Sequence, residues 1–315
     1  MVTRRVQLTG KSTYIVSLPK DWARLNNVKA GSELHLIQED DGGLRINSSL
    51  EALKQKTAEI SLEGKKENEI RREFISKYIG GYSIIKFTSQ QRIAPETRRN
   101  INNEVSRLIG LEVVEEESLF ITVQDFFSTE NLSIEKAVKR AYAITINMHE
   151  NLINALEKEK KTLSIASQDD EVDRVFFLVL RQLGIALENA SFLKALNLKS
   201  SDCIPFTRLI TALERIADNI AKQANEADKA KPDKELAELN SQALEVYSNA
   251  VKAFFSSNKT LANQALEQKE LLVEKCEQAK AKSKAAAENN LLIDKVASIA
   301  EHAAEIAEIA IDKEK

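Results

Sequence analysis

Leu213-Glu214-Arg215-Ile216-Ala217-Asp218-Asn219 is the stretch that decides the fold of the second half of this 315-residue chain. Because side chains four residues apart share one face of a helix, Glu214 and Asp218 present their carboxylates side by side. The segment Ser298-Ile299-Ala300-Glu301-His302-Ala303-Ala304-Glu305 repeats this spacing with Glu301 and Glu305. Helical carboxylates that recur in this way indicate a repeated metal-binding or docking surface.

The distribution of glycine and proline separates a turn-rich head from a helical tail. All nine glycines lie at or before Gly184, and the 131 residues after it (315 − 184) contain only Pro205 and Pro232 as strong breakers. A chain of 315 residues also exceeds the length of one ordinary domain. We therefore predict a multidomain α+β protein with domains over 1–48, 55–127 and 130–315.

The first 48 residues have the alternation of β-structure. Apolar residues alternate with polar ones around Val6 and again from Tyr14 to Leu18. Pro19 is expected at the first position of a short helix, because its missing N–H costs nothing there. Two further strands are expected at 34–38 and 44–46. Four short strands around one helical turn bury little surface, so we predict that this domain dimerises.

The segment 55–127 alternates between β and helical patterns. The order βαβαββ is that of a small α/β unit, of the ferredoxin-like or a related kind. No phosphate-cradling loop or catalytic set occurs in it. The predicted strands cover 58–62, 82–88, 111–115 and 119–124, and the predicted helices cover 67–79 and 95–109.

From Ser133 onward the period of the apolar residues is helical. Six long helices with short links indicate two consecutive three-helix units. In the third helix Leu213 and Ile216 lie on the apolar stripe, which puts Glu214 and Asp218 at or beyond its solvent edge. The six predicted helices run over about 133–160, about 168–196, about 201–230, from Pro232 onward, from a cap at 256–258 onward, and over about 289–312.

The tail resembles the PhoU family, whose fold is two tandem three-helix bundles with a Glu/Asp-x-x-x-Asp signature on the bundle helices. The stretch 213–219 is similar to that signature, and Asp169 to Asp173 supplies the partner motif of the first repeat. In the second repeat Ala297 occupies the place of Glu214. The resemblance therefore implies an all-α domain of tandem bundles whose second acidic motif is eroded.

The head resembles the SpoVT/AbrB family of swapped-hairpin DNA-binding domains. The resemblance rests on Gly10-Lys11-Ser12, on the run from Ile15 to Trp22, and on the run from Val28 to Leu34. It implies a β-barrel formed by two chains that exchange hairpins. A head of this kind joined to a PhoU-like tail is similar to phosphate-uptake regulators of the archaeal type.

The carboxylates of the first repeat are the candidate metal ligands. Four carboxylates on a pair of helices would supply hard oxygen donors to Mg²⁺, Mn²⁺ or iron, with Zn²⁺ as a further candidate. The alternative is a solvated acidic face in which Arg174 and Arg215 pair with carboxylates of their own helices. The candidate ligands are Asp169, Asp173, Glu214 and Asp218, followed by the less favoured set Glu301, His302 and Glu305.

The first thirty residues form a local basic patch. They contain six Lys or Arg residues against Asp21 alone, a balance of 6 − 1 = +5, whereas the whole chain has a formal net charge of −3. On a dimer these cations would contact phosphates twice over. The alternative is the ordinary solvated face of a small β unit. The candidate DNA-binding residues are Arg4, Arg5, Lys11, Ser12, Thr13, Lys20 and Arg24.

No motif for nucleotide-driven or triad catalysis occurs in the sequence, so we expect no enzyme. Cys203 and Cys276 stand far apart, which favours reduced thiols, and no signal-peptide or membrane-spanning pattern is present. We predict a cytoplasmic, homodimeric, DNA-binding regulator of phosphate uptake that acts on promoters. The alternative is a PhoU-type adaptor that docks on a phosphate ABC transporter without binding DNA.

Overall fold

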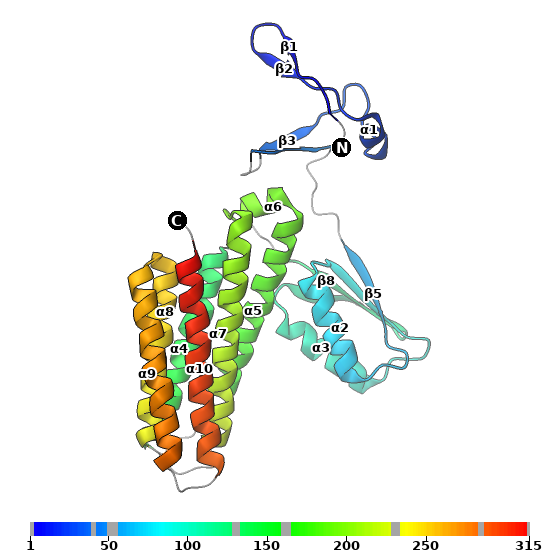
Figure 1. Cartoon of the computed structure of the whole chain (residues 1–315). Helices are drawn as coiled ribbons and strands as arrows, with labels where there is room; N and C mark the ends of the chain where they lie inside the picture. Colours follow the sequence, from blue (N-terminus) through cyan, green and yellow to red (C-terminus); the bar gives the residue numbers. More distant parts are fainter. Residues whose placement is uncertain are drawn as a thin grey trace. The chain divides into compact units, whose positions relative to one another are not determined.

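The computed structural model describes residues 3–38, 42–48, 56–127, 133–158, 165–227, 234–282 and 287–313 (Figure 1). The chain divides into two compact units, an N-terminal unit over Met1–Lys54 and a C-terminal unit over Gln55–Lys315. The predicted domains 55–127 and 130–315 both lie within the C-terminal unit. We call the first of them the α/β part and the second the helical part.

Two antiparallel hairpins and one short helix make up the N-terminal unit. The strands pair as β1 with β2 and β3 with β4, as two separate two-stranded sheets. Pro19 is the N-cap of the helix, not its first residue as predicted, because its ψ of 129° is still extended. Residues 39–41 lie outside the described residues. The elements are β1 (Gln7–Thr9), β2 (Thr13–Ile15), α1 (Lys20–Leu25), β3 (His35–Gln38) and β4 (Leu44–Asn47).

The N-terminal unit has no hydrophobic core of its own among its described residues. None of those residues is buried, and Tyr14 is 76% exposed. A closed barrel would need strands from outside this chain, since an isolated two-stranded hairpin is marginally stable. The other large apolar side chains exposed in this unit are Val6, Leu8, Ile15, Val16, Leu25, Leu36 and Leu44.

The α/β part contains a four-stranded sheet of order β5-β6-β8-β7. β5 and β6 are parallel, and the other two pairs are antiparallel. In a ferredoxin-like sheet another strand lies between the two parallel strands of the βαβ unit. Here β5 and β6 are direct neighbours, so the ferredoxin-like expectation is wrong. The predicted βαβαββ order along the chain is confirmed. The elements are β5 (Thr57–Ser61), α2 (Glu67–Ile79), β6 (Ile84–Thr88), α3 (Pro95–Arg107), β7 (Leu111–Glu116) and β8 (Phe120–Asp125).

One face of this sheet is buried and the other is more exposed. Burial alternates residue by residue along β5 and β6, as the period of a strand requires. Ile60, Ile85 and Val123 from the strands share one core with Phe74 of α2 and Ile101 of α3. Both helices therefore cover the same face of the sheet.

The helical part forms two three-helix units that share one core. α4, α5 and α7 pack on one another, and so do α8, α9 and α10, with α7 against α10 and α4 against α8 (Figure 1). The predicted helix over 168–196 is two helices, because Asn189 caps a new one by accepting from the Phe192 N–H at 3.0 Å. The helices are α4 (Ile134–Lys158), α5 (Ile165–Glu188), α6 (Ala190–Ala195), α7 (Ser200–Ala227), α8 (Lys234–Ser256), α9 (Lys259–Lys282) and α10 (Ala287–Asp312).

A buried polar network joins the two three-helix units. His149 of α4 lies 2.8 Å, through Nε2, from Oδ1 of Asn240 on α8, and the Asn240 amide donates to Gln223 of α7 at 3.1 Å. The His149 ring also stacks on Tyr247 at 5.7 Å. Burial lowers the pKa of His149 to about 4. The imidazole is therefore neutral at physiological pH, with Nε2 as the donor to Asn240.

We expect acid to destabilise the C-terminal unit through His149. Its pKa is about 6.5 in the unfolded chain and about 4 in the folded one, so the unfolded chain takes up the proton first. Stability is complete above pH 6.5 and is lost as the pH falls toward 4, by roughly 3 kcal/mol in total. Urea unfolding at pH 7 and pH 4.5 measures this loss. Between these two pH values His149→Gln should lose less stability than the wild type; an equal loss in both would assign it to other groups.

Arg181 of α5 fixes the α/β part to the helical part. Its guanidinium is buried, donates to the backbone carbonyl of Tyr78, and lies 2.6 Å from Oδ2 of Asp125 at the end of β8. Next to it the turn after α2 contacts α5 closely: a Cβ on Gly81, whose φ is +77°, would lie 2.8 Å from Cγ1 of Ile185. Any other residue at position 81 would thus have a strained backbone and would clash with Ile185.

Candidate functional site

The four candidate carboxylates of the first repeat lie on two neighbouring helices. Asp169 and Asp173 belong to α5, and Glu214 and Asp218 belong to α7, which packs against it. All four are half-buried. For Glu214 and Asp218 the spacing predicted a position at or beyond the solvent edge of the apolar stripe, and the fold buries both further because α5 and α7 pack against each other. We call these four residues the acidic quartet.

Burial and neighbouring carboxylates raise the pKa values of Glu214, Asp169 and Asp173. Burial raises the pKa of Glu214 to about 7, with smaller contributions from the charges of Asp218 and Asp173. Burial likewise raises the pKa of Asp169 to about 6, again assisted by Asp173 and Asp218. The pKa of Asp173 is also raised, mainly by burial. Glu214 and Asp169 therefore take up protons near neutral pH, unlike solvated carboxylates.

Two cations contact this acidic surface, and one of them comes from a distant part of the sequence. Lys222 lies one turn along α7, with Nζ 2.6 Å from Oδ2 of Asp218. Arg107, at the end of α3 in the α/β part, lies 2.8 Å from Asp170 and 3.6 Å from Asp173. No local pattern pointed to Arg107, because 63 residues separate it from its partner Asp170. Arg215 also contacts a second helix: its guanidinium lies 3.7 Å from Glu305 of α10, while its charge partly offsets the raised pKa of Glu214 on its own helix.

The second repeat has a different electrostatic arrangement. Glu301 forms an ion pair with Lys269 of α9 at 2.8 Å. Glu305 lies 3.2 Å from Nδ1 of His302 in addition to its contact with Arg215. Ala297, which replaces the expected carboxylate, packs against the apolar core. The carboxylates of this repeat are thus compensated by protein cations.

No group of three or more His, Cys, Asp or Glu side chains among the described residues is arranged to hold a metal ion. The acidic quartet offers oxygen donors only, a set that suits Mg²⁺ or Mn²⁺ better than Zn²⁺, which favours nitrogen and sulfur. Metal binding at Asp169, Asp173, Glu214 and Asp218 stays a prediction. The same holds for Glu301, His302 and Glu305.

We expect Glu214→Gln to stabilise the folded chain at pH 8. The folded pKa of Glu214 is raised from 4.5 to about 7, so its contribution to stability is complete below pH 4.5 and is lost as the pH rises through 7. The side chain is half-exposed, so solvent screening reduces the gain to about 1 kcal/mol. Urea unfolding in metal-free buffer at pH 8 and pH 5 measures it. Glu301→Gln is the matched control and should not stabilise, because it loses the ion pair with Lys269.

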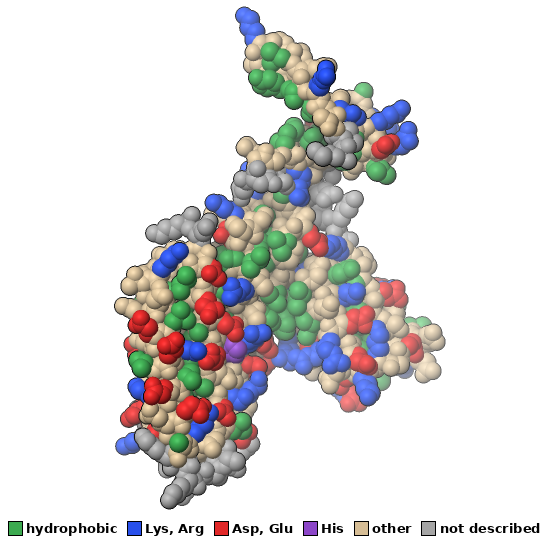
Figure 2. Space-filling view, in the orientation of Figure 1, with side chains coloured by type: hydrophobic (Ala, Val, Ile, Leu, Met, Phe, Trp, Pro, Cys, Tyr) green, Lys and Arg blue, Asp and Glu red, His purple; other side chains and the backbone are tan. Residues whose placement is uncertain are grey.

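The candidate DNA-binding residues all lie exposed on the N-terminal unit. Lys11 and Ser12 lie in the β1–β2 turn, Thr13 begins β2, and Lys20 and Arg24 belong to α1. Figure 2 shows Lys, Arg and apolar side chains on this unit with little acidic surface. Together with Arg4 and Arg5, these cations form no ion pair within the described part of the chain.

The fold and its charged surfaces define a class of protein: a multidomain α+β chain with a basic, strand-rich unit, a small α/β part and tandem three-helix bundles. Comparison with family models then gives the particular domains. Residues 138–227 match the PhoU domain, and residues 7–55 match the model for antidote-toxin recognition MazE, bacterial antitoxin. The PhoU match covers most of α4 and continues to the end of α7, so it spans the first three-helix unit.

These two matches confirm the predicted combination of domains. The PhoU domain supports a role in the regulation of phosphate homeostasis, and the MazE-type domain is compatible with DNA binding; both families are regulatory. No curated protein and no solved structure matches the chain. Within the described ranges, no helix has both the length and the hydropathy needed to cross a membrane.

Proposed function

We propose that the protein is a DNA-binding transcriptional regulator of phosphate uptake. The observation that carries this proposal is the set of cations without ion-pair partners in the described residues of a MazE-type unit, in the same chain as a PhoU domain. The N-terminal unit binds promoter DNA, and the PhoU domain reports phosphate or transporter status to it. The proposal places the protein in the cytoplasm, where both promoter DNA and a phosphate transporter are accessible.

A homodimer is the form that binds DNA in this proposal. The described part of the N-terminal unit buries none of its side chains, and its apolar residues Leu8, Leu36 and Leu44 are each more than half exposed. A stable protein covers this much exposed apolar surface, and a second copy of the same unit is always available to cover it. Light scattering of the full chain should therefore give twice the mass of one chain. A monomer at micromolar concentration would contradict the dimer.

A dimer would present each basic residue twice. Arg4, Arg5 and Lys11 from two copies would contact the phosphates on both sides of a groove, while Ser12 and Thr13 at the hairpin turn would donate hydrogen bonds to the DNA backbone. Counterions released from the phosphates would then drive most of the binding. Affinity should consequently fall steeply as the salt concentration rises.

We also propose that the acidic quartet binds a divalent cation, Mg²⁺ or Mn²⁺. Its support is the position of four half-buried carboxylates on two packed helices, of which Glu214 and Asp169 have raised pKa values. Occupancy would require Lys222 and Arg107 to move from Asp218 and Asp173. Calorimetric titration with MgCl₂ or MnCl₂ tests the proposal, with Glu214→Gln and Asp218→Asn combined as the variant that should lose binding.

The alternative function is that of a PhoU-type adaptor that modulates a phosphate ABC transporter without DNA. The observation in its favour is that the PhoU match spans more of the chain than the MazE match. In that case the N-terminal unit would only dimerise the protein.

Genome-wide mapping of DNA bound to the full chain, in cells grown at high and at low phosphate, distinguishes the two functions. The regulator predicts discrete sites near phosphate-transport genes, with occupancy that changes with phosphate. The adaptor predicts no enriched site in either condition. Purification of the same tagged chain from membranes would then recover the transporter.

A further inference from the structure

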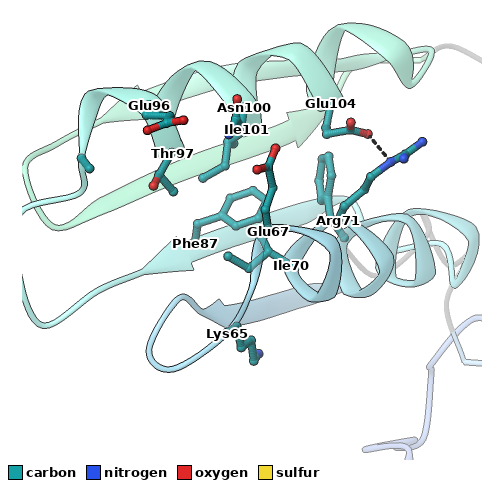
Figure 3. A pocket seen from close by; sticks show the side chains of 12 residues that line it. Lys65, Glu67, Ile70, Arg71, Phe87, Glu96, Thr97, Asn100, Ile101 and Glu104 are labelled. Atoms are coloured by element: carbon teal, nitrogen blue, oxygen red, sulfur yellow. Dashed lines mark hydrogen bonds and ion pairs between the residues drawn. The ribbon is translucent and has the colours of Figure 1, made fainter.

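A cavity lies between the two helices of the α/β part, above the sheet, and the proposed function gives it no role. It encloses about 200 Å³ and is lined by residues of α2, β6 and α3 (Figure 3). This volume is below the roughly 300–1,000 Å³ of pockets for drug-sized ligands. It would suit a molecule of only a few carbon atoms.

The inner wall of the cavity is apolar. Phe74 of α2 and Phe87 of β6 form it, with their ring centroids 5.1 Å apart, and Ile70 and Ile101 flank them. All four belong to or pack against the core of the α/β part. An occupant would therefore place an apolar body against two aromatic rings.

The charges at the rim favour a cationic head group. Lys65 and Arg71 line the cavity, but each already has an ion-pair partner. Lys65 pairs with Glu73, and Nε of Arg71 lies 3.2 Å from Oε2 of Glu104. Glu67 and Glu96 have no hydrogen-bond or ion-pair partner among the described residues. The uncompensated charge around the cavity is thus two carboxylates.

The positions of these two carboxylates exclude an anion as the preferred ligand. Glu67 is the first residue of α2, and Glu96 is the second residue of α3. The first turns of two helices would by themselves attract an anion, but here an anion would meet both carboxylates. Figure 3 shows Glu67 extending toward α3, where the polar side chains of Thr97 and Asn100 complete the rim.

We propose that this cavity binds a small organic cation, a primary ammonium group on a short apolar chain. The ammonium group donates its three hydrogen bonds to Glu67, to Glu96 and to an oxygen of Thr97 or Asn100. The chain lies against Phe74 and Phe87, whose ring faces also attract a cation. The α/β part is in this way a sensor domain for an amine metabolite, carried on the same chain as the PhoU domain.

Three probes with the same carbon chain test the head group: n-pentylamine, 1-pentanol and sodium pentanoate, each titrated into the full chain by calorimetry. We expect the amine to bind about tenfold or more tightly than the alcohol, as one partly desolvated charged contact implies, and pentanoate to bind least. Equal affinities, a preference for pentanoate, or no saturable binding of the amine would overturn the proposal.

Two variants test the location. Glu67→Gln combined with Glu96→Gln removes two exposed charges and should weaken the amine about tenfold while leaving the alcohol unchanged. Glu112→Gln on β7, away from the cavity lining, is the matched control and should bind the amine as the wild type does. Asn100→Trp fills the cavity and should abolish binding of all probes. Amine binding that survives in both cavity variants would refute the site, with folding verified by circular dichroism.

Discussion

Arg181→Met should lower the free energy of unfolding of the C-terminal unit by about 3–5 kcal/mol, the range found when a buried ion pair loses one partner. Methionine replaces most of the volume of the arginine side chain, so the loss is mainly electrostatic. The variant would leave the Asp125 carboxylate buried without its cation and the Tyr78 carbonyl without its donor. Chemical denaturation of the full chain at pH 7 measures the change.

Two further variants separate this electrostatic loss from simple loss of an arginine. Arg208→Met removes an exposed arginine of α7 whose guanidinium lies 3.7 Å from Asp312, and it should change stability by less than about 1 kcal/mol. Asp125→Asn added to Arg181→Met removes the stranded charge but keeps an oxygen for the Phe127 N–H. The double variant should therefore be more stable than Arg181→Met alone. If Arg181→Met were as mild as Arg208→Met, the two parts would be held together by other contacts.

Local patterns predicted most of the elements of the fold. The scarcity of glycine in the tail and its helical period predicted the two three-helix units, and alternation predicted the strands of the head and of the α/β part to within a few residues. The order of the strands in the sheet was not accessible, because it depends on which backbones pair. Arg181 was missed for the same reason: its partners Tyr78 and Asp125 lie 103 and 56 residues away in sequence.

The candidate site was predictable where it depended on a single helix. The spacing of Glu214 and Asp218 was enough to place both on one face of α7. The ion-pair network that ends at Asp173 of the acidic quartet was not: Arg71 pairs with Glu104, Glu104 lies 3.9 Å from Arg107, and Arg107 contacts Asp173. A chain of ion pairs therefore leads from the cavity in the α/β part to the acidic quartet. Only the packing of α3 near α5 creates it, and no local pattern encodes that packing.

The exposed residues of the N-terminal unit illustrate a second limit of sequence reasoning. Tyr14, Val16 and Leu18 occupy alternate positions, a pattern that predicts packing on one face of a strand, yet Tyr14 is 76% exposed in the single chain. Alternation identifies the apolar face of a strand but not what covers it. If the unit dimerises as proposed, the interpretation holds for the dimer and fails for one chain alone.

Arg4→Ala combined with Arg5→Ala should weaken promoter binding by roughly a hundredfold or more at physiological salt. In the proposed dimer the double variant removes four cations. Because each phosphate contact contributes about 0.9 to the slope of log affinity against log salt, the slope should become shallower by up to about 3.6. Gel shifts or fluorescence anisotropy across a series of salt concentrations measure affinity and slope together.

The control for this experiment is a variant with the same change in net charge outside the N-terminal unit. Arg72→Ala combined with Arg99→Ala removes two exposed arginines of the α/β part and should leave affinity and slope as in the wild type. A fall in affinity with an unchanged slope would mean that Arg4 and Arg5 support the fold of the unit without contacting phosphates. Equal effects of the two variants would indicate nonspecific attraction, since general charge and not a defined surface would then drive binding. Failure of the wild-type chain to bind any promoter would leave the adaptor as the function, with the basic unit serving to pair two chains.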